Sequence, residues 1–255
     1  MLKKEEYRRL YNKGATDTWS RVSHFYGRDA ISTFFNSREK DIVRRRVRVK
    51  SGDSVLDIAC GPGRWVLHYA TVGGRVVGLD ISPRMIKSAK SKLKMLDGVD
   101  FVVGDAEHLP LRDETFDVVS VFDAFPDFPN PFKSILEMRR VANARGIVVV
   151  EQSNILSLTG FLMILASGFF SRIRDFFKLS RRYVWFDRWT RLELPVTVEN
   201  WLEQARFHYE IVGAGILPPL MHKLIRPLLS FEKGIEKFKV FNILGFRLVF
   251  LCTKV

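Results

Sequence analysis

The chain has 255 residues, of which 47% are apolar, and a formal net charge of +13 from 41 basic and 28 acidic residues. This length allows one large domain, or a domain with an insertion, around a sizeable core. Its two cysteines, Cys60 and Cys252, cannot by themselves make a disulfide framework or a four-ligand zinc site, and they favour a reducing, cytoplasmic location. The positive charge favours anionic partners such as nucleic acid, anionic lipid or phosphorylated substrates, or it serves solubility alone.

Residues 1–50 have a polar, helical pattern with interspersed aromatic side chains, and they end in the basic run 44–50. We expect this part of the chain to form a helical lid segment beside a main domain at 51–255. The first 13 residues are charged throughout, so we expect no secretory signal.

From residue 51 onward, short apolar runs typical of strands alternate with helical stretches. Strands are predicted at 55–59, 75–80, 99–103, 116–122 and 146–152, and helices at 63–71, 83–96 and 131–141, with Ser82 as an N-cap. This alternation predicts a parallel sheet covered on both faces. The segment 153–190 interrupts it as an insertion. A helix capped by Thr197, a strand at 209–216, a helical region at 218–239 and a final strand at 245–254 are predicted to follow.

The strongest chemical signal is the stretch VLDIACGPGR at 55–64, an apolar strand that runs into a glycine bend and then a helix. Gly61 and Gly63 let the backbone approach a ligand where a Cβ atom would collide. Asp80 ends the next strand, 19 residues after Gly61, where a carboxylate can accept both ribose hydroxyls of a nucleoside. The pattern therefore indicates a ligand that contains adenosine.

Two differences from other nucleotide-binding motifs narrow the choice of ligand. Val66 stands where a dinucleotide-binding fingerprint has its third glycine, and the Gly-Lys-Ser/Thr of a P-loop is absent. Asp57, before the bend, would repel a pyrophosphate but suits an ammonium group, such as the methionine end of S-adenosylmethionine.

Four stretches in order resemble the motifs of class I S-adenosylmethionine-dependent methyltransferases: 56–63 resembles motif I, 77–85 motif II, 104–111 motif III and 116–121 motif IV. The small-molecule branch, which includes the ubiquinone and menaquinone methyltransferases, is the most similar. The segments 197–212 and 245–254 resemble its closing helix and hairpin. The resemblance implies a Rossmann-like, mostly parallel α/β sheet of seven strands in the order 3-2-1-4-5-7-6, with the last strand antiparallel.

The resemblance also implies roles for individual residues. The methionine moiety would be held by Asp57, Ala59, Gly61 and Gly63, the ribose by Asp80, and the adenine by Ile81, Met85, Asp105 and Ala106, with Phe122 and Asp123 near the sulfonium. The alternative for Asp57, Asp80 and Asp105 is that they are loop carboxylates that cap helices.

Two segments depart from the family pattern. Residues 142–146 read ANARG where LKPGG is usual, and we expect this to affect only a turn. The segment 123–131 reads DAFPDFPNP, which lacks both the Asp/Asn-Pro-Pro-aromatic motif of amino-group nucleic-acid methylases and the Pro-Cys of cytosine-C5 enzymes. This difference weakens the interpretation that the substrate is a nucleic-acid base.

Methyl transfer from a sulfonium is an in-line displacement that needs position and a dry pocket, and it leaves S-adenosylhomocysteine. No metal is required, and we expect none. A general base helps if the acceptor is a hydroxyl, and the candidates are His24, Tyr26, Asp123 and Glu151, none of which is singled out by its spacing.

The insertion at 153–190 gives information about the methyl acceptor. Ile155–Phe170 is apolar but has only 16 residues, about 24 Å as a helix against a hydrocarbon core of about 30 Å, so we do not expect it to span a membrane. A basic stretch with tryptophans follows at 172–191. Together they suit a lid over 155–190 that touches the anionic inner face of a membrane, or one that admits a hydrophobic small-molecule acceptor. The alternatives are a substrate-capping helix pair or a dimer contact.

The sequence also allows two other functions. The basic runs 44–50 and 172–191 and the pI of about 9.9 allow an RNA methyltransferase that acts on tRNA or rRNA, although no recognised RNA-binding module accompanies them. A non-catalytic adenosine-ligand binder or partner protein is the third candidate, and the intact glycine bend and Asp80 argue against it.

Overall fold

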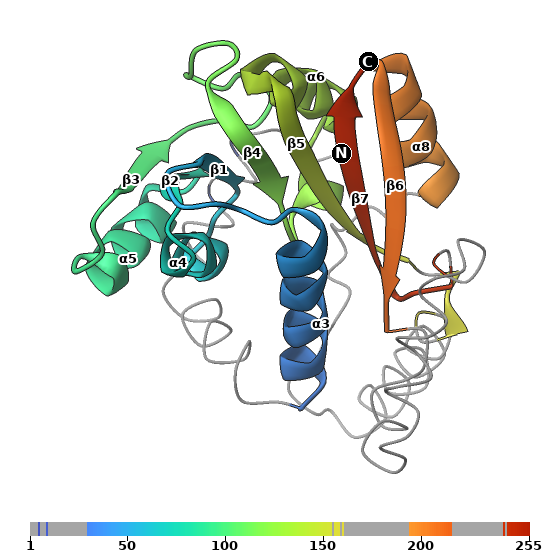
Figure 1. Ribbon diagram of the computed structural model, residues 1–255, viewed down its shortest axis with the longest axis horizontal. Helices are drawn as coiled ribbons and strands as arrows, with labels where there is room; N and C mark the ends of the chain where they lie inside the picture. The colour runs from blue at the N-terminus through green and yellow to red at the C-terminus, as the bar shows by residue number, and fades with distance from the viewer. Residues whose placement is uncertain are drawn as a thin grey trace.

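The computed structural model describes residues 30–154, 156–158, 160, 194–215, 242 and 244–255, together with the single positions 5 and 9. Seven strands form one sheet in the order β3-β2-β1-β4-β5-β7-β6, which confirms the predicted order (Figure 1). The strands are β1 Ser54–Ile58, β2 Arg75–Asp80, β3 Val99–Val103, β4 Phe116–Val121, β5 Ala142–Ser153, β6 Phe207–Ala214 and β7 Arg247–Lys254.

The pairing is parallel from β3 to β5 and antiparallel on both sides of β7. The parallel strands therefore end at one edge of the sheet, where the loops that carry the predicted motifs emerge. Since β1 lies between β2 and β4, the loops after these three strands are neighbours in space.

Helices cover both faces of the sheet. They are α3 Ala30–Arg46, α4 Arg64–Thr71, α5 Pro83–Leu93, α6 Pro131–Val141 and α8 Pro195–Gln204, with a short 3-10 helix, η1, at Phe125–Asp127. Apolar side chains of α3, α4 and α5 form one buried layer with the sheet, and those of α6 and α8 form the other. The described part is thus a three-layer α/β unit, and α3 shares its core.

The predicted N-cap of α5 is confirmed. The Ser82 hydroxyl accepts a hydrogen bond of 3.3 Å from the Met85 N–H, with Pro83 in the first turn. The start of α6 is built in the same way, because the Asn130 side chain accepts from the Lys133 N–H at 3.1 Å and Pro131 follows.

Three details of the sequence prediction were wrong. Helix α8 begins at Pro195 after Leu194 and is not capped by Thr197, because a proline at the first position already fixes a helical φ. The stretch 142–146 is not a turn but the start of β5, where Ala142 pairs with Phe116 across a register irregularity. Strand β6 begins at Phe207, two residues earlier than predicted. The Phe207 side chain is buried, and its backbone pairs with Lys254 at the end of β7.

Several predicted features lie outside the described residues: the lid segment before residue 30, nearly all of the insertion 153–190, and the helical region at 218–239. Among the helices that the structure does describe, none combines the length and the apolar character needed to cross a bilayer.

Candidate active site

A cavity of about 520 Å³ opens at the carboxyl ends of β1, β2, β3 and β4. Its wall includes all ten residues predicted to contact the cofactor, together with Asp123. The ten are Asp57, Ala59, Gly61, Gly63, Asp80, Ile81, Met85, Asp105, Ala106 and Phe122. The structure thus brings together loops that are far apart in the sequence.

The glycine bend after β1 has an unusual backbone. Ala59, Gly61 and Gly63 all have positive φ, at 54°, 53° and 92°. The Gly61 N–H donates to Asp80 Oδ2 at 2.9 Å, and the Ser82 N–H donates to Asp80 Oδ1 at 2.8 Å. Asp80 therefore joins the bend to the end of β2. Because a carboxylate can accept about four hydrogen bonds, it keeps capacity for two more.

Close packing between α4 and the sheet comes from a glycine that the sequence analysis did not single out. Val66 occupies the place of the missing third glycine on α4, and it packs over Gly78 of β2. A Cβ atom at Gly78 would lie 2.9 Å from Val66 Cγ2 and 3.0 Å from Cys60 Sγ. The space for close helix–sheet packing is therefore provided by Gly78 of β2, and not by a glycine on α4.

We expect alanine to have different effects at the two glycines of the bend. At Gly63, a Cβ would lie 2.7 Å from Leu93 Cδ1 on a backbone with φ of 92°, so Gly63→Ala should lower the melting temperature by several degrees. At Gly61, no atom lies within 4 Å of the Cβ position, so the strain is limited to about 1–2 kcal/mol. Gly61→Ala should instead fill cavity space and weaken S-adenosylhomocysteine binding at least about tenfold.

Thermal denaturation and calorimetric titration of both variants would test this pair. Wild-type affinity in folded Gly61→Ala would show that no ligand approaches this part of the bend.

Asp57 is buried, at 2% exposure, on the cavity wall. Its Oδ1 accepts from the Ser120 hydroxyl at 3.2 Å, and its Oδ2 has no hydrogen-bond partner among the described residues. The Val66 N–H faces this carboxylate without reaching hydrogen-bond geometry. Burial raises the Asp57 pKa to about 7, even though the Arg64 guanidinium and the Ser120 hydrogen bond lower it. An uncompensated oxygen in a cavity wall is suited to a cationic ligand group.

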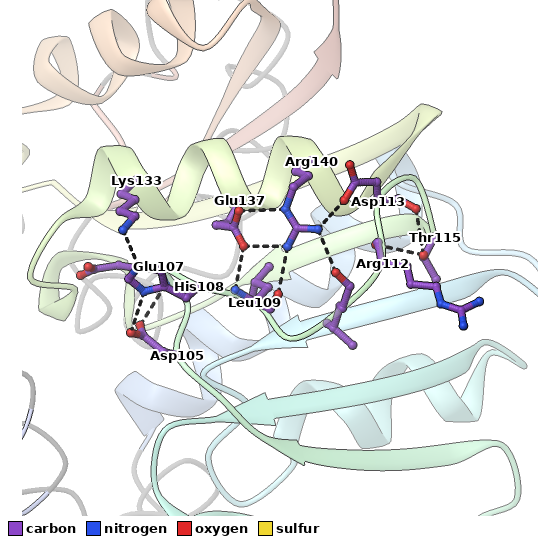
Figure 2. A network of polar contacts seen from close by, with 11 residues as sticks. Asp105, Glu107, His108, Leu109, Arg112, Asp113, Thr115, Lys133, Glu137 and Arg140 are labelled. Carbon is purple, nitrogen blue, oxygen red and sulfur yellow. Dashed lines mark hydrogen bonds and ion pairs between the residues drawn. The ribbon is translucent and has the colours of Figure 1, made fainter.

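The loop that carries Asp105 and Ala106 is fastened to α6, as Figure 2 shows. Glu137 accepts from the Leu109 N–H at 2.7 Å, and Arg140 donates to the carbonyls of Leu109 and Leu111. The Arg140 hydrogen bonds lower the pKa of Glu137, which keeps this carboxylate charged. This network fixes the loop and so holds Asp105 at the cavity.

Within that loop, Asp105 Oδ1 accepts from the Glu107 N–H at 2.9 Å, and its Oδ2 lies 3.2 Å from His108 Nδ1. Asp105 therefore caps a local turn and not a helix, which differs from the alternative interpretation, and it also lines the cavity.

Phe122, at the end of β4, stacks on Trp65 of α4. Their ring centroids are 3.8 Å apart and the planes differ by 17°. Both rings are at least 95% buried, and both line the cavity. Phe122 thus gives the cavity a rigid aromatic wall between α4 and the end of β4.

Next to this wall lies a group of five charged side chains, which we call the acid–guanidinium cluster: Glu39, Arg64, Asp123, Glu151 and Arg247. Arg64 and Asp123 also line the cavity. Asp123 Oδ2 is 2.6 Å from Arg64, and its Oδ1 pairs with Arg247. Glu151 accepts from Arg247 at 2.8 Å and from the Asp123 N–H at 2.7 Å. Glu39 lies 3.8 Å from Arg64 and 3.9 Å from Arg247. Five separate elements thus meet beside the cavity.

The three carboxyl groups of this cluster have pKa values that are shifted in different directions. Burial raises the pKa of Glu39 to about 8, helped by the Asp123 charge, and it also raises the pKa of Glu151. Burial alone would raise the Asp123 pKa too, but Arg247 and Arg64 together lower it. Asp123 is therefore held as a carboxylate with both oxygens engaged, which favours a positioning role over proton abstraction.

The candidate bases are therefore placed differently. Asp123 lines the cavity, Glu151 is 1% exposed behind it, and His24 and Tyr26 lie outside the described residues. Glu39, Arg64 and Arg247 were missed by the sequence analysis, as were Asn36 and Lys40 of α3, which line the cavity. Asn36, Glu39 and Lys40 share helix α3, and Arg247 begins β7, so no motif marks these four residues. Arg64 ends the stretch 55–64, but nothing in its spacing assigns it a role.

Among the residues that the structure describes, two groups of side chains have acidic or histidine ligand atoms close enough together for a metal ion. In one, Glu39, Asp123 and Glu151, the guanidiniums of the cluster already engage the carboxylates. In the other, His108 contacts Asp105 and Lys133, and Glu107 accepts from the Asn130 N–H. Both groups thus have protein partners, and metal-free transfer stays a prediction.

The cavity lies at the carboxyl ends of the parallel strands, where the strand order reverses between β1 and β4. This is the place at which Rossmann-like folds bind nucleotide cofactors. A family model described as "Methyltransferase domain" matches residues 56–150. The demethylmenaquinone methyltransferase of Staphylococcus aureus strain JH9 is 29% identical over 175 residues, which cover 64% of this chain and 72% of the relative.

Solved structures share the fold. An S-adenosylmethionine-dependent methyltransferase from Aquifex aeolicus superposes with a TM-score of 0.60 at 16% identity, covering 92% of this chain and 98% of the other. Magnesium protoporphyrin IX methyltransferase from Synechocystis PCC 6803, with bound S-adenosylhomocysteine, gives 0.63 at 15% identity, covering 99% and 100%. Residues 56–150 thus match a methyltransferase domain, and the comparisons support a class I S-adenosylmethionine-dependent methyltransferase that resembles the quinone methyltransferases.

Proposed function

We propose that the cavity binds S-adenosylmethionine with its methionine end at the glycine bend, its ribose at Asp80 and its adenine between the Ile81 and Ala106 loops. The methyl group then lies toward Phe122 and Asp123. The acceptor is a small hydrophobic molecule.

The observation that carries the cofactor proposal is the uncompensated Oδ2 of Asp57 in the cavity wall. An ammonium placed there supplies the missing hydrogen bond and an opposite charge. The free capacity of Asp80 for two ribose hydroxyls supports the same orientation.

The charge of the cavity also fits a cationic cofactor. Six carboxylates line it, at Asp57, Asp80, Asp105, Glu107, Asp123 and Asp127, against the three cations Lys40, Arg64 and Lys92. The chain as a whole is strongly basic, so the acidic cavity is a local exception. A phosphate backbone would be repelled at this site, which favours a small-molecule acceptor over tRNA or rRNA.

The hydrophobic acceptor is supported by two observations. The Staphylococcus aureus relative carries the name of a demethylmenaquinone methyltransferase. Ala124, Phe128 and Pro129 add apolar surface to the cavity beyond Asp123. We propose a quinone-like aromatic ring as the acceptor class.

When bound, the cofactor supplies an activated methyl group on a sulfonium. The protein's own residues hold the methionine and ribose ends, and the Trp65–Phe122 stack excludes water beside the reacting atoms. The cluster fixes Asp123 at the cavity, and its Arg64 and Arg247 contacts keep that carboxylate charged.

Turnover of methyl-labelled S-adenosylmethionine with a demethylated naphthoquinone and, separately, with unmodified tRNA would test the proposal. We expect label in the quinone and none in the RNA. Labelled RNA with an unlabelled quinone would refute the acceptor class but keep the cofactor site. Membrane contact through 155–190 stays a prediction, which co-sedimentation of full-length and deleted protein with anionic liposomes would test.

A further inference from the structure

Helix α3 places two polar side chains at the cavity that no motif marks. Asn36 and Lys40 are four residues apart, so they lie on the same face of the helix, and both line the cavity. The Asn36 side chain accepts from Arg64 Nη1, which joins this face to the first turn of α4. Lys40 is therefore carried to the part of the cavity that adjoins the glycine bend.

Lys40 also interacts electrostatically with charged neighbours at the cavity. Burial and the Arg64 guanidinium lower the Lys40 pKa, whereas Glu39 raises it. Lys40 in turn lowers the pKa of His68, one turn beyond Arg64 on α4. Lys40 and Asp57 are thus both within electrostatic reach of Arg64, which is the strongest charged influence on Asp57.

The other two cations of the cavity are less suited to bind an anionic group. Arg64 is engaged by Asp123 at 2.6 Å, by Asn36 and, at 3.8 Å, by Glu39. Lys92 is exposed on α5, the helix that follows β2 on the adenosine side. Lys40 is half-buried, and within the described residues it makes no hydrogen bond and no ion pair of its own.

An amino-acid group carries an ammonium and a carboxylate on the same carbon, so it requires opposite charges side by side. Asp57 offers the negative charge and an open hydrogen-bond position. From this arrangement we propose that Lys40 binds the carboxylate of the cofactor's amino-acid end and so selects cofactors that retain it. This inference rests on the proposed cofactor site.

The test compares two ligands that differ only in that carboxylate. Calorimetric affinities for S-adenosylmethionine and for decarboxylated S-adenosylmethionine would be measured with wild type, Lys40→Met and Lys40→Arg, and Lys90→Met on the exposed side of α5 would serve as the control. Lys40→Met should weaken binding of the complete cofactor at least about tenfold and change binding of the decarboxylated form less than about twofold. Lys40→Arg should restore most of the affinity.

Equal losses for both ligands in Lys40→Met would show a structural role, and no loss for either would show that the side chain does not meet the cofactor. Both results would overturn the inference while leaving the cofactor site intact. If wild type bound neither ligand, the proposed function itself would fail.

Discussion

Asp57→Asn is expected to weaken S-adenosylmethionine binding about 10- to 100-fold while making the ligand-free protein more stable at pH 8. The amide can keep the hydrogen bond from Ser120, but it removes the charge that faces the cofactor's ammonium. A hydrogen bond to a charged group contributes about 1.5–3 kcal/mol, which corresponds to this loss of affinity.

The stability gain follows from the direction of the pKa shift. Asp57 ionises near 3.8 when the chain is unfolded and near 7 in the folded protein. The folded state therefore binds this proton more tightly, and the free energy of unfolding falls as the pH rises between these two values, by up to about 4 kcal/mol. Asparagine does not ionise, so its advantage should be absent at pH 4 and complete above pH 7.

The same linkage predicts that wild-type affinity for the cofactor falls below pH 7, because the carboxylate must lose its proton to meet an ammonium. Calorimetry between pH 5.5 and 8, in buffers of different ionisation enthalpy, would detect the released proton. Asp100→Asn, on the exposed side of β3, is the matched control and should change neither property. If the affinity of the wild-type protein did not depend on pH, this would contradict the proposal that Asp57 binds the cofactor's ammonium group.

Arg247→Gln is expected to destabilise the protein by about 3–5 kcal/mol at pH 8, which lowers the melting temperature by on the order of 10 °C. Arg247 contacts all three carboxylates of the acid–guanidinium cluster, and only Arg64 would then remain to balance them. Removing one partner from a buried ion pair leaves an uncompensated charge, which costs more than the pair contributes.

The cost of Arg247→Gln should shrink as the pH falls, because Glu39 and Glu151 already have raised pKa values and become neutral first. Adding Glu39→Gln should recover much of the lost stability at pH 8. Arg46→Gln breaks an exposed pair with Glu210 at 3.3 Å and should cost less than about 1 kcal/mol. If Arg247→Gln behaved like Arg46→Gln in thermal denaturation, the cluster would be structurally unimportant.

The sheet and the cofactor loops could be predicted from sequence because their signals are local. Apolar runs mark the strands, and the bend at Gly61 and the acid at Asp80 follow strand ends directly. Once the strands are parallel and β1 lies between β2 and β4, these loops must meet. The errors at Thr197 and at 142–146 are also local, since Pro195 and the pairing of Ala142 override the expected cap and turn.

The acid–guanidinium cluster could not be predicted in this way. Glu39 and Arg247 are more than 200 residues apart, and each belongs to an element whose residue pattern is explained without it. Their proximity depends on the docking of α3 and on the place of β7 in the sheet, which only tertiary packing determines. Lys40 was missed for the same reason.

The position of β7 has a consequence during biosynthesis. It is the last of the seven strands to be translated, yet it lies between β5 and β6 and pairs with both. Until the nascent chain reaches Lys254, β5 has an unpaired edge of apolar residues and β6 has no neighbour in the sheet. Ribosome-bound intermediates should therefore depend on chaperones more than the finished protein does.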